Sequence, residues 1–482
     1  MNPRWCDGWD WLIFSCALLL AWFAAADHAG SWNDGSRLAT VEALVDRHTW
    51  AIDDSIFVAV PPPGPDRSTP YPAGDELLMT RGTLDKLWIR GHYYSDKSPL
   101  PALLLAVEYG AWRTLTGQTA RTDVAGFCKA MTLGSSGLAF VLAVWGIYRL
   151  GRVLQVPLPS RLGLTASFAV CTIALPYARY VNNHILLLAV AVGLLVELTW
   201  LARGAGAQTN GRLLRLGALA GLAYGIDLGA GPVLFAGTLA LVAWRCRAIG
   251  KVGLFVAATL PGLVLHHALN YAIGGTFKPA NAVADYFLWP GCPFNEHTMT
   301  GVWNHDGIGA FLLYALDLLF GKRGFLGHNL ALLLLLPALA TLLRRREGRP
   351  ETLLALAWCG GVWMAYAATS TNLSGVCCSI RWFVPLLAPG YYLLALLLRD
   401  RPQWRRDFLI LSSWGVVMGV LMAREGAWMS HMVPGYWVLY VGALVCWGWG
   451  IVQRWRAGSR QRSLHRLVMC RSMSRTEIMP NG

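Results

Sequence analysis

The sequence has few charged residues. Only 14% of its 482 residues are Asp, Glu, Lys or Arg, whereas 55% are apolar, and an average soluble protein carries roughly a quarter charged residues. The apolar residues gather into long runs, which excludes a disordered or fibrous chain. A chain this poor in charge is expected to be an integral membrane protein with many spans, and a set of soluble domains is excluded.

The sequence also lacks the patterns of metal-binding and nucleic-acid-binding proteins. Its 11 cysteines form no CxxC motif or His/Cys cluster with zinc spacing, and most lie inside apolar runs, as small buried residues do. The net charge of +14 comes from 41 basic and 27 acidic residues. No stretch interleaves basic with aromatic residues as single-stranded nucleic acid requires. No nucleic-acid partner is therefore predicted, and the basic excess is assigned to cytoplasmic loops.

What the sequence does have is a series of apolar runs, many of them near the length of roughly 20 residues that spans a bilayer. Its 23 Trp residues suit aromatic belts at the two interfaces. We therefore expect an all-α polytopic membrane protein with about 11–13 transmembrane helices. The runs cover Trp11–Ala26, Pro99–Leu115, Val124–Tyr148, Leu162–Tyr177, Ile185–Leu201, Leu213–Ile226, Leu228–Trp244, Val252–Ala272, Phe325–Leu343, Leu353–Thr369, Trp382–Leu398, Phe408–Met422 and Tyr436–Val452.

Basic residues orient these runs. Four clusters and the C-terminal tail fall on one side of the membrane when the intervening spans are taken in pairs, and the positive-inside rule makes that side the cytoplasm. The five are Arg203–Arg215, Arg245–Lys251, Arg344–Arg349, Arg399–Arg406 and Arg454–Arg475. One conflict remains, because Arg149, Arg152 and Arg161 lie outside if Pro99–Leu115 crosses. Either this run does not fully cross, or the loop is an exception to the rule.

The longest polar stretch, Asp27–Ser98, is predicted to be the first outer loop. Apolar residues recur with helical spacing from Leu38 to Val45, which predicts an amphipathic helix lying in the membrane interface. A second outer loop is expected at 271–307, and Asp306–Phe320 is expected to lie along the interface. We therefore expect one transmembrane domain over residues 1–453, followed by a basic cytoplasmic tail at 454–482.

Two stretches of the first loop, Asn33–Arg37 and Gly91–Leu100, carry a recognisable pattern. They resemble the GT-C superfamily of membrane glycosyltransferases, in particular its bacterial aminoarabinose transferase and protein O-mannosyltransferase branches. In that family the loop opens with Asp-Glu-x-Arg and closes with Gly-x-x-Tyr-x-x-Lys-Pro-Pro-Leu. The matching residues are Asp34 and Arg37, then Lys97, Pro99 and Leu100, with Gly35 and Ser98 standing where Glu and Pro are usual.

The resemblance implies a hexosyl- or pentosyltransferase that moves a sugar from a polyprenyl-phosphate donor to a lipid, glycan or protein acceptor. It places the enzyme in the bacterial inner membrane with its catalytic loops facing the periplasm. The leaving phosphate needs charge neutralisation, which Lys and Arg supply. Lys97 and Arg381 are the candidates for this role, and each has an interface anchor as its alternative. His92 and Tyr94 are further candidates for the donor phosphate, or else belong to the aromatic belt.

An acceptor hydroxyl needs a carboxylate within hydrogen-bond reach, and the resemblance gives this role to Asp34. The alternative is that Asp34 caps a helix beginning near Arg37, since Asp favours such positions. Arg37, Asp53, Asp54 and Asp96 are secondary candidates. No metal or other cofactor is required, because no spaced pair of carboxylates argues for a divalent ion.

Two other classes of protein remain open at this stage. A transporter or flippase of lipid-linked or sugar substrates would keep its functional charges near the bilayer midplane, where Glu197 and Asp227 lie in apolar runs. A surface-polysaccharide ligase or polymerase would share the lipid-linked donor and use a late outer loop, for which Arg424–His431 is a candidate.

Overall fold

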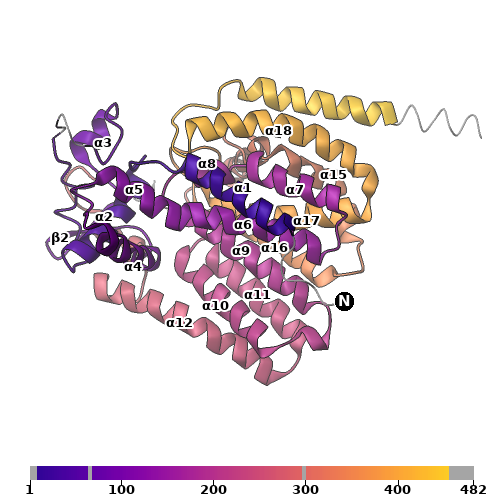
Figure 1. The fold of residues 1–482 in the computed structure, drawn as a ribbon, viewed down its shortest axis with the longest axis horizontal. Coiled ribbons are helices and arrows are strands. Elements are labelled where there is room, and N and C mark those ends of the chain that lie inside the picture. Colours follow the sequence, from indigo (N-terminus) through magenta and orange to yellow (C-terminus); the bar gives the residue numbers. More distant parts are fainter. Residues whose placement is uncertain (1–7, 63, 65–67, 296–299, 455–482) are drawn as a thin grey trace, which may run out of the picture.

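The computed structural model describes residues 8–62, 64, 68–295 and 300–454. In this part of the chain nearly all regular structure is helical, and a two-stranded antiparallel hairpin is its single sheet. Figure 1 shows a bundle of helices with a smaller layer packed on one end. We call this smaller part the outer layer. It consists of α2 (Trp32–Asp46), α3 (Glu76–Arg81), β1 (Lys86–Ile89), β2 (His92–Ser95) and α4 (Pro99–Thr116).

The bundle begins with α1 and continues after α4. Its helices are α1 (Gly8–Ala24), α5 (Val124–Thr132), α6 (Leu138–Val153), α7 (Leu158–Val170), α8 (Ala174–Tyr177), α9 (Asn183–Leu201), α10 (Asn210–Ile226), α11 (Gly231–Cys246), α12 (Ile249–Gly274), α13 (Ile308–Phe320), α14 (Phe325–His328), α15 (Leu335–Leu343), α16 (Arg349–Thr369), α17 (Leu387–Asp400), α18 (Arg405–Glu425) and a last helix, Tyr436–Arg454. A π-helical turn, η1 (Leu133–Gly137), joins α5 to α6, and a 3₁₀ turn, η6 (Arg381–Leu386), leads into α17.

Seven helical segments of the described chain are long and apolar enough to cross a membrane, and the number is eight if one bent pair counts as a span. The multispan helical class expected from the sequence is therefore confirmed. Fewer segments pass this test than the expected number of spans, because several apolar runs form short helices such as α1, α7, α10 and α11. The bent pair, Ile308–His328 and Leu330–Leu343, turns by 113°, so the expected span Phe325–Leu343 is broken.

Helix α4 belongs to the outer layer. It packs on α2 in the outer layer and is not among the candidate spans of the described chain. Arg152 Nη1 lies 2.9 Å from Asp10 Oδ2 in the first turn of α1. Arg149 and Arg152 therefore lie at the same end of the bundle as the start of α1.

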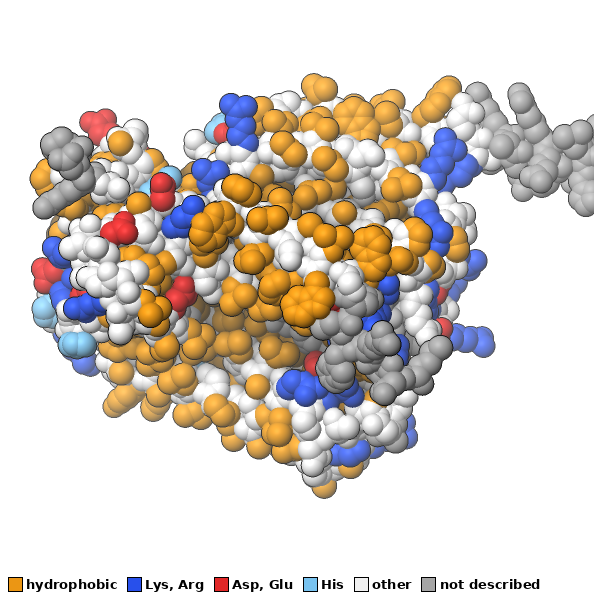
Figure 2. Space-filling view, in the orientation of Figure 1, with side chains coloured by type: hydrophobic (Ala, Val, Ile, Leu, Met, Phe, Trp, Pro, Cys, Tyr) orange, Lys and Arg blue, Asp and Glu red, His pale blue; other side chains and the backbone are white. Residues whose placement is uncertain are grey.

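Ion pairs between helix ends join the basic clusters at one end of the bundle, which we call the basic end. Arg245 pairs with Glu351 at 2.6 Å and Arg345 pairs with Asp400 at 2.8 Å. Arg399 donates a hydrogen bond to the carbonyl of Leu154 after α6. The charges in Figure 2 agree, because Lys and Arg gather at the end of the bundle away from the outer layer and the acidic residues are more frequent over that layer.

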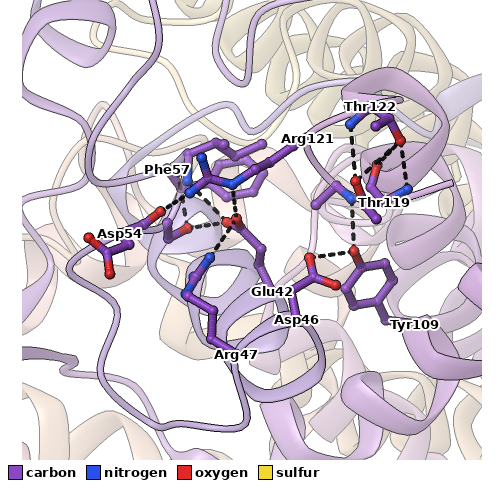
Figure 3. A network of polar contacts seen from close by, with 12 residues as sticks. Glu42, Asp46, Arg47, Asp54, Phe57, Tyr109, Thr119, Arg121 and Thr122 are labelled. Atoms are coloured by element: carbon purple, nitrogen blue, oxygen red, sulfur yellow. Dashed lines mark hydrogen bonds and ion pairs between the residues drawn. The ribbon is translucent and has the colours of Figure 1, made fainter.

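Helix α2 forms where the amphipathic pattern predicts a helix, but it is buried on its polar side as well. Its residues from Asn33 to Ala43 are all buried. The fully buried Glu42 accepts hydrogen bonds from Ser55 Oγ at 2.5 Å and from the Ile56 amide at 3.0 Å, and it pairs with Arg47 (Figure 3). Helix α2 therefore forms the core of the outer layer, with polar side chains that contact other protein groups.

Helices α10 and α12 approach each other closely through glycine. A Cβ on Gly221 would lie 2.5 Å from the Thr259 carbonyl oxygen, and a Cβ on Gly262 would lie 2.6 Å from the Gly221 backbone. No other residue type fits at these positions without moving a helix. The two helices are therefore held in contact, which fixes where their outer ends stand.

Candidate active site

A cavity of about 440 Å³ lies between the outer layer and the ends of five bundle segments, at the end opposite the basic end. Its volume falls within the roughly 300–1,000 Å³ common for ligand sites. Its wall is contributed by α2, the connection from β2 to α4, α9, α10 and the turn that follows it, α12, α16, η6 and two parts of the second outer loop, 279–282 and 300–301. The polar lining residues are Asn33, Arg37, Asp96, Lys97, Ser98, Asn183, His184, Asp227, His266, Asn270, Asn281, Thr300, Tyr366, Thr369 and Arg381.

Helix boundaries place several of these side chains. Asn182 caps α9 by accepting a hydrogen bond from the Ile185 amide at 3.1 Å, which puts Asn183 and His184 in the first turn of α9. Asp227 ends α10 and accepts hydrogen bonds from the amides of Gly229 and Ala230 at 2.9 and 3.0 Å. A carboxylate in this position satisfies the amides that open α11.

Arg37 is a buried cation, and every oxygen that accepts a hydrogen bond from its guanidinium belongs to a neutral group. Its guanidinium donates to the Asn33 carbonyl at 2.7 Å, to the Asn33 side chain and to Asn183 Oδ1 at 2.6 Å. Its Nε has no hydrogen-bond partner in the described chain. Burial lowers the pKa of Arg37 to about 10. A cation that is buried without a directly bonded carboxylate suits the binding of an anion.

Arg381 lies across the cavity at the start of η6. Its backbone amide donates to Ser374 Oγ at 3.1 Å, and its guanidinium carbon lies 5.9 Å from the centre of the Trp428 ring. Its Nε is buried and, like that of Arg37, has no hydrogen-bond partner among the described residues. The structure thus brings Arg381 and Arg37, from distant parts of the sequence, to one cavity.

Lys97 also lines the cavity, but it is paired on two sides. Its Nζ lies 2.5 Å from Asp85 and 2.8 Å from Asp96. Asp96 Oδ1 has no hydrogen-bond partner in the described chain, and burial raises the pKa of Asp96. Ser98, which replaces the usual Pro, donates from Oγ to the Gly225 carbonyl at 2.5 Å and so fixes this loop on the end of α10.

Asp34, the expected base, does not line the cavity in this structure. Its two oxygens accept hydrogen bonds at 2.6 Å from the Gly30 amide and from Ser31 Oγ, at the turn that starts α2. Burial raises the pKa of Asp34 to about 6. Helix α2 begins at Trp32 with Ser31 as its N-cap, so Asp34 lies in the first turn and is not the cap of a helix beginning near Arg37.

The remaining candidates lie outside the cavity. His92 is exposed on the hairpin and lies 3.2 Å from Asp53, which also accepts from the Tyr93 amide. Asp54 is exposed on the neighbouring loop. Tyr94 lines a second, much smaller pocket beside Arg37 and Lys97.

Sequence reasoning missed the neutral polar residues of the site. Asn183 and His184 come from the start of α9, whereas His266 and Asn270 come from the second half of α12, within a long apolar run. Asn183 and His184 belong to an Asn-Asn-His run at a predicted span end, which was a usable signal. In the described chain no group of three or more His, Cys, Asp or Glu side chains could hold a metal ion.

Comparison with known proteins identifies the fold. No protein-family model matches the sequence, and no curated protein matches it. Among solved structures, the ArnT aminoarabinose transferase from Cupriavidus metallidurans in its apo state aligns with a TM-score of 0.53 at 14% identity, over 91% of this chain and 75% of that one. The same protein bound to undecaprenyl phosphate aligns with a TM-score of 0.50 at 14% identity, over 91% of this chain and 76% of that one. This chain therefore has the fold of the GT-C membrane glycosyltransferases, as the sequence predicted.

Proposed function

We propose that the protein is a membrane glycosyltransferase that transfers a sugar from a polyprenyl-phosphate donor to an acceptor inside the cavity. The observation that carries this proposal is the pair of buried guanidinium groups, Arg37 and Arg381, each with an unpartnered Nε at one cavity. The GT-C fold and the undecaprenyl phosphate bound to the similar ArnT support the choice of ligand.

The charge of the cavity fits such a donor. Three permanent cations, Arg37, Lys97 and Arg381, line the cavity with the carboxylates Asp96 and Asp227, and Asp85 pairs with Lys97 from outside the lining. A sugar joined to a polyprenyl phosphate is a phosphodiester, and it carries one negative charge. Two Arg residues with free donors bind such a group through charge-assisted hydrogen bonds. Since Lys97 is already paired with two carboxylates, we assign the main phosphate contacts to the two arginines.

Helix α12 offers a route for the polyprenyl chain. It is 26 residues long and mostly unburied, and its His266 and Asn270 line the cavity while Leu260 and Val264 are exposed on its apolar surface. An apolar tail can therefore lie along α12 in the bilayer while the phosphate enters between the outer layer and the bundle. We assign the basic end to the cytoplasm and the cavity to the opposite, periplasmic side of a bacterial inner membrane, following the positive-inside rule.

The transporter alternative has less support. Glu197 forms ion pairs with Arg212 and Arg215 at 2.8 and 2.9 Å, and it lies toward the basic end of α9. Asp227 does line the cavity, but at the end of α10 beside the other site residues rather than in mid-span. Among the described residues, the charged side chains of the cavity therefore lie together at one end of the bundle and not in mid-span.

The test is binding of undecaprenyl phosphate to the purified protein in nanodiscs, measured for Arg381→Ala, Arg37→Ala and a matched control, Arg424→Ala. Arg424 is exposed at the end of α18 and does not line the cavity. Loss of a charge-assisted contact worth about 1.5–3 kcal/mol predicts a weakening of roughly 10- to 150-fold for each site variant.

The control should bind like the wild-type protein. Release of undecaprenyl phosphate from a panel of synthetic undecaprenyl-phosphate hexoses and pentoses then measures transfer. Equal affinity of all three variants, together with no release from any donor by the wild-type protein, would refute the proposed function.

A further inference from the structure

One contact in the cavity has no part in binding the donor phosphate. His184 Nδ1 lies 3.3 Å from Asp227 Oδ2. Both side chains are more than nine-tenths buried, and both line the cavity. The second ring nitrogen of His184, Nε2, has no hydrogen-bond partner in the described part of the chain and is available to a substrate. Contacts of this kind are often loose in an unliganded site and tighten when the substrate binds.

Asp227 is held firmly in the position that this contact needs. Its Oδ1 accepts from the amides of Gly229 and Ala230 and from the Tyr366 hydroxyl at 3.3 Å. Its Oδ2 accepts from Asn183 Nδ2 at 2.7 Å. The carboxylate therefore cannot turn away from His184 without breaking contacts to several elements.

We infer that His184, oriented by Asp227, is the general base that activates the acceptor, and that the acceptor group is a neutral hydroxyl. This inference rests on the proposed function, because it assigns a role within the same cavity. A carboxylate beside Nδ1 selects the tautomer with its proton on Nδ1, which leaves the lone pair of Nε2 to accept a proton. The arrangement is that of an oriented base, as in Asp–His pairs of other enzymes.

The acceptor oxygen attacks the anomeric carbon of the donor and forms the new glycosidic bond. The bond from that carbon to the phosphate oxygen breaks, and polyprenyl phosphate leaves with the electron pair. The hydroxyl proton moves to His184 Nε2, and Asp227 stabilises the resulting imidazolium. Arg37 and Arg381 neutralise the charge that develops on the leaving phosphate.

The need for a base distinguishes between classes of acceptor. A phosphate or carboxylate oxygen is already anionic and attacks without losing a proton. A sugar, lipid or side-chain hydroxyl must lose its proton, and a positioned base contributes roughly 10²–10⁴-fold to such a step. The oriented His184 therefore points to an alcohol as acceptor.

The position of His184 explains why it suits this role better than the acids of the first loop. Asp34 is occupied by two hydrogen bonds outside the cavity, and Asp96 is paired with Lys97. The charged and titratable groups that share the cavity with His184 come from several of the surrounding segments. They are Arg37 from α2, Asp96 and Lys97 from the connection to α4, Asp227 after α10, His266 from α12, Tyr366 from α16 and Arg381 from η6.

The experiment compares His184→Gln, Asp227→Asn, Asp34→Asn and a matched histidine control, His267→Gln, in proteoliposomes. His267 is one position from the cavity-lining His266, but its ring contacts the Tyr224 hydroxyl at 3.1 Å and the Phe277 carbonyl at 3.0 Å. Two quantities are measured for each variant: affinity for undecaprenyl phosphate, and release of undecaprenyl phosphate from the donor panel as a function of pH.

We expect His184→Gln to bind undecaprenyl phosphate like the wild-type protein while its turnover falls by roughly 10²–10⁴-fold. Wild-type turnover should fall toward acidic pH as His184 takes up a proton, and the residual activity of His184→Gln should lack this acidic limb. Asp227→Asn should lower turnover in the same way, and His267→Gln and Asp34→Asn should retain it.

Wild-type turnover by His184→Gln would overturn the inference, as would loss of turnover in Asp34→Asn alone or a product in which the sugar is joined to a phosphate oxygen. These results leave the proposed function standing, because the wild-type protein still transfers. Failure of the proposed function is recognised separately, by a wild-type protein that neither binds undecaprenyl phosphate through its arginines nor releases it from any donor.

Discussion

At the scale of single residues, the site is set apart by cations whose charge is compensated to different degrees. Arg37 and Arg381 have free donor atoms, whereas Lys97 is held between Asp85 and Asp96. Removing one member of a buried ion group leaves the others uncompensated, which costs more than the pair contributes. A Lys97 variant therefore reports on stability as well as on binding.

We predict that Lys97→Met lowers the apparent melting temperature in detergent strongly, because two buried carboxylates are left facing each other. The expected cost is about 3–5 kcal/mol. The double variant Lys97→Met/Asp85→Asn should recover part of this loss, since it removes one of the two charges. If Lys97→Met has the melting temperature of the wild-type protein, Lys97, Asp85 and Asp96 do not form a buried ion group.

Asp34 gives a prediction that depends on pH. Burial raises the pKa of Asp34 from 3.8 to about 6, so the unfolded chain ionises this group at lower pH than the folded protein does. The folded state therefore loses stability as pH rises from about 4 to about 6, and the full cost, about 3 kcal/mol, is present at neutral pH.

Asn carries no charge and avoids this cost. Asp34→Asn should match the melting temperature of the wild-type protein near pH 4 and exceed it near pH 7.5. The same substitution at the exposed Asp54 is the control, and its melting curve should follow the wild-type protein at both pH values. If the melting temperatures of Asp34→Asn and the wild-type protein differ by the same amount at both pH values, Asp34 does not have the raised pKa described above.

Residue-level prediction from the sequence singled out charged residues in recognisable patterns that the structure brings to one cavity. Lys97, Arg381, Arg37 and Asp96 all line the cavity, although their roles stay proposals. It failed to foresee how Asp34 is oriented, because hydrogen bonds to a turn are not visible in residue spacing. His184 was reachable only as a polar residue at a span end, since its partner Asp227 is distant in the sequence.

At the scale of elements, helix ends rather than helix middles build the site. Helices α9, α10 and α16 contribute their terminal residues, and the contact between α10 and α12 fixes two of the walls. Gly221 and Gly262 permit that contact, so a side chain added there changes the cavity from a distance.

We predict that Gly221→Ala lowers the melting temperature, at a cost of about 1–3 kcal/mol for overpacking. It should also weaken binding of undecaprenyl phosphate, because Asp227 at the end of α10 and His266 on α12 are displaced relative to each other. The control is Gly253→Ala on α12, where an added Cβ meets nothing within 4 Å. That variant should be as stable as the wild-type protein or more so. If the two variants have equal melting temperatures and equal affinities for undecaprenyl phosphate, the contact between α10 and α12 does not position the cavity walls.

Elements were predicted well where the sequence pattern is strong. Long apolar runs became helices, and the pattern from Leu38 to Val45 became α2. One element and the burial of another were not foreseen, for physical reasons. The hairpin of β1 and β2 is short and depends on contacts with the second outer loop, such as the hydrogen bond from Trp289 Nε1 to the Lys86 carbonyl at 3.2 Å. The burial of α2 depends on partners such as Tyr71, whose hydroxyl donates to the Phe57 carbonyl at 2.8 Å.

At the scale of the whole molecule, two ends of opposite character define the protein. One end joins the basic clusters through ion pairs, and the other carries the cavity and the acid-rich outer layer (Figure 2). The basic tail from 455 onward lies outside the described residues, but Arg454 pairs with Asp407 near the basic end. The multispan class was predictable because it follows from composition. The difference between the two ends could not be predicted without the folded structure, because the sequence alone does not show that α4 packs in the outer layer.

We predict that the two ends face different compartments. A protease site inserted at the exposed hairpin tip, between Arg90 and Gly91, should be cut from outside in cells whose outer membrane alone is permeabilised. A site inserted between Arg345 and Arg346 should be cut only after the inner membrane is opened. Cleavage of both sites from the same side would contradict the orientation proposed for the cavity.

The most direct test of phosphate binding by Arg37 and Arg381 is a cryo-electron microscopy structure of the protein in nanodiscs with undecaprenyl phosphate. We expect phosphate density inside the cavity, within about 3 Å of donor nitrogens on both Arg37 and Arg381, with the polyprenyl chain along α12. Phosphate density outside the cavity, or density in the cavity that contacts neither arginine, would contradict this expectation.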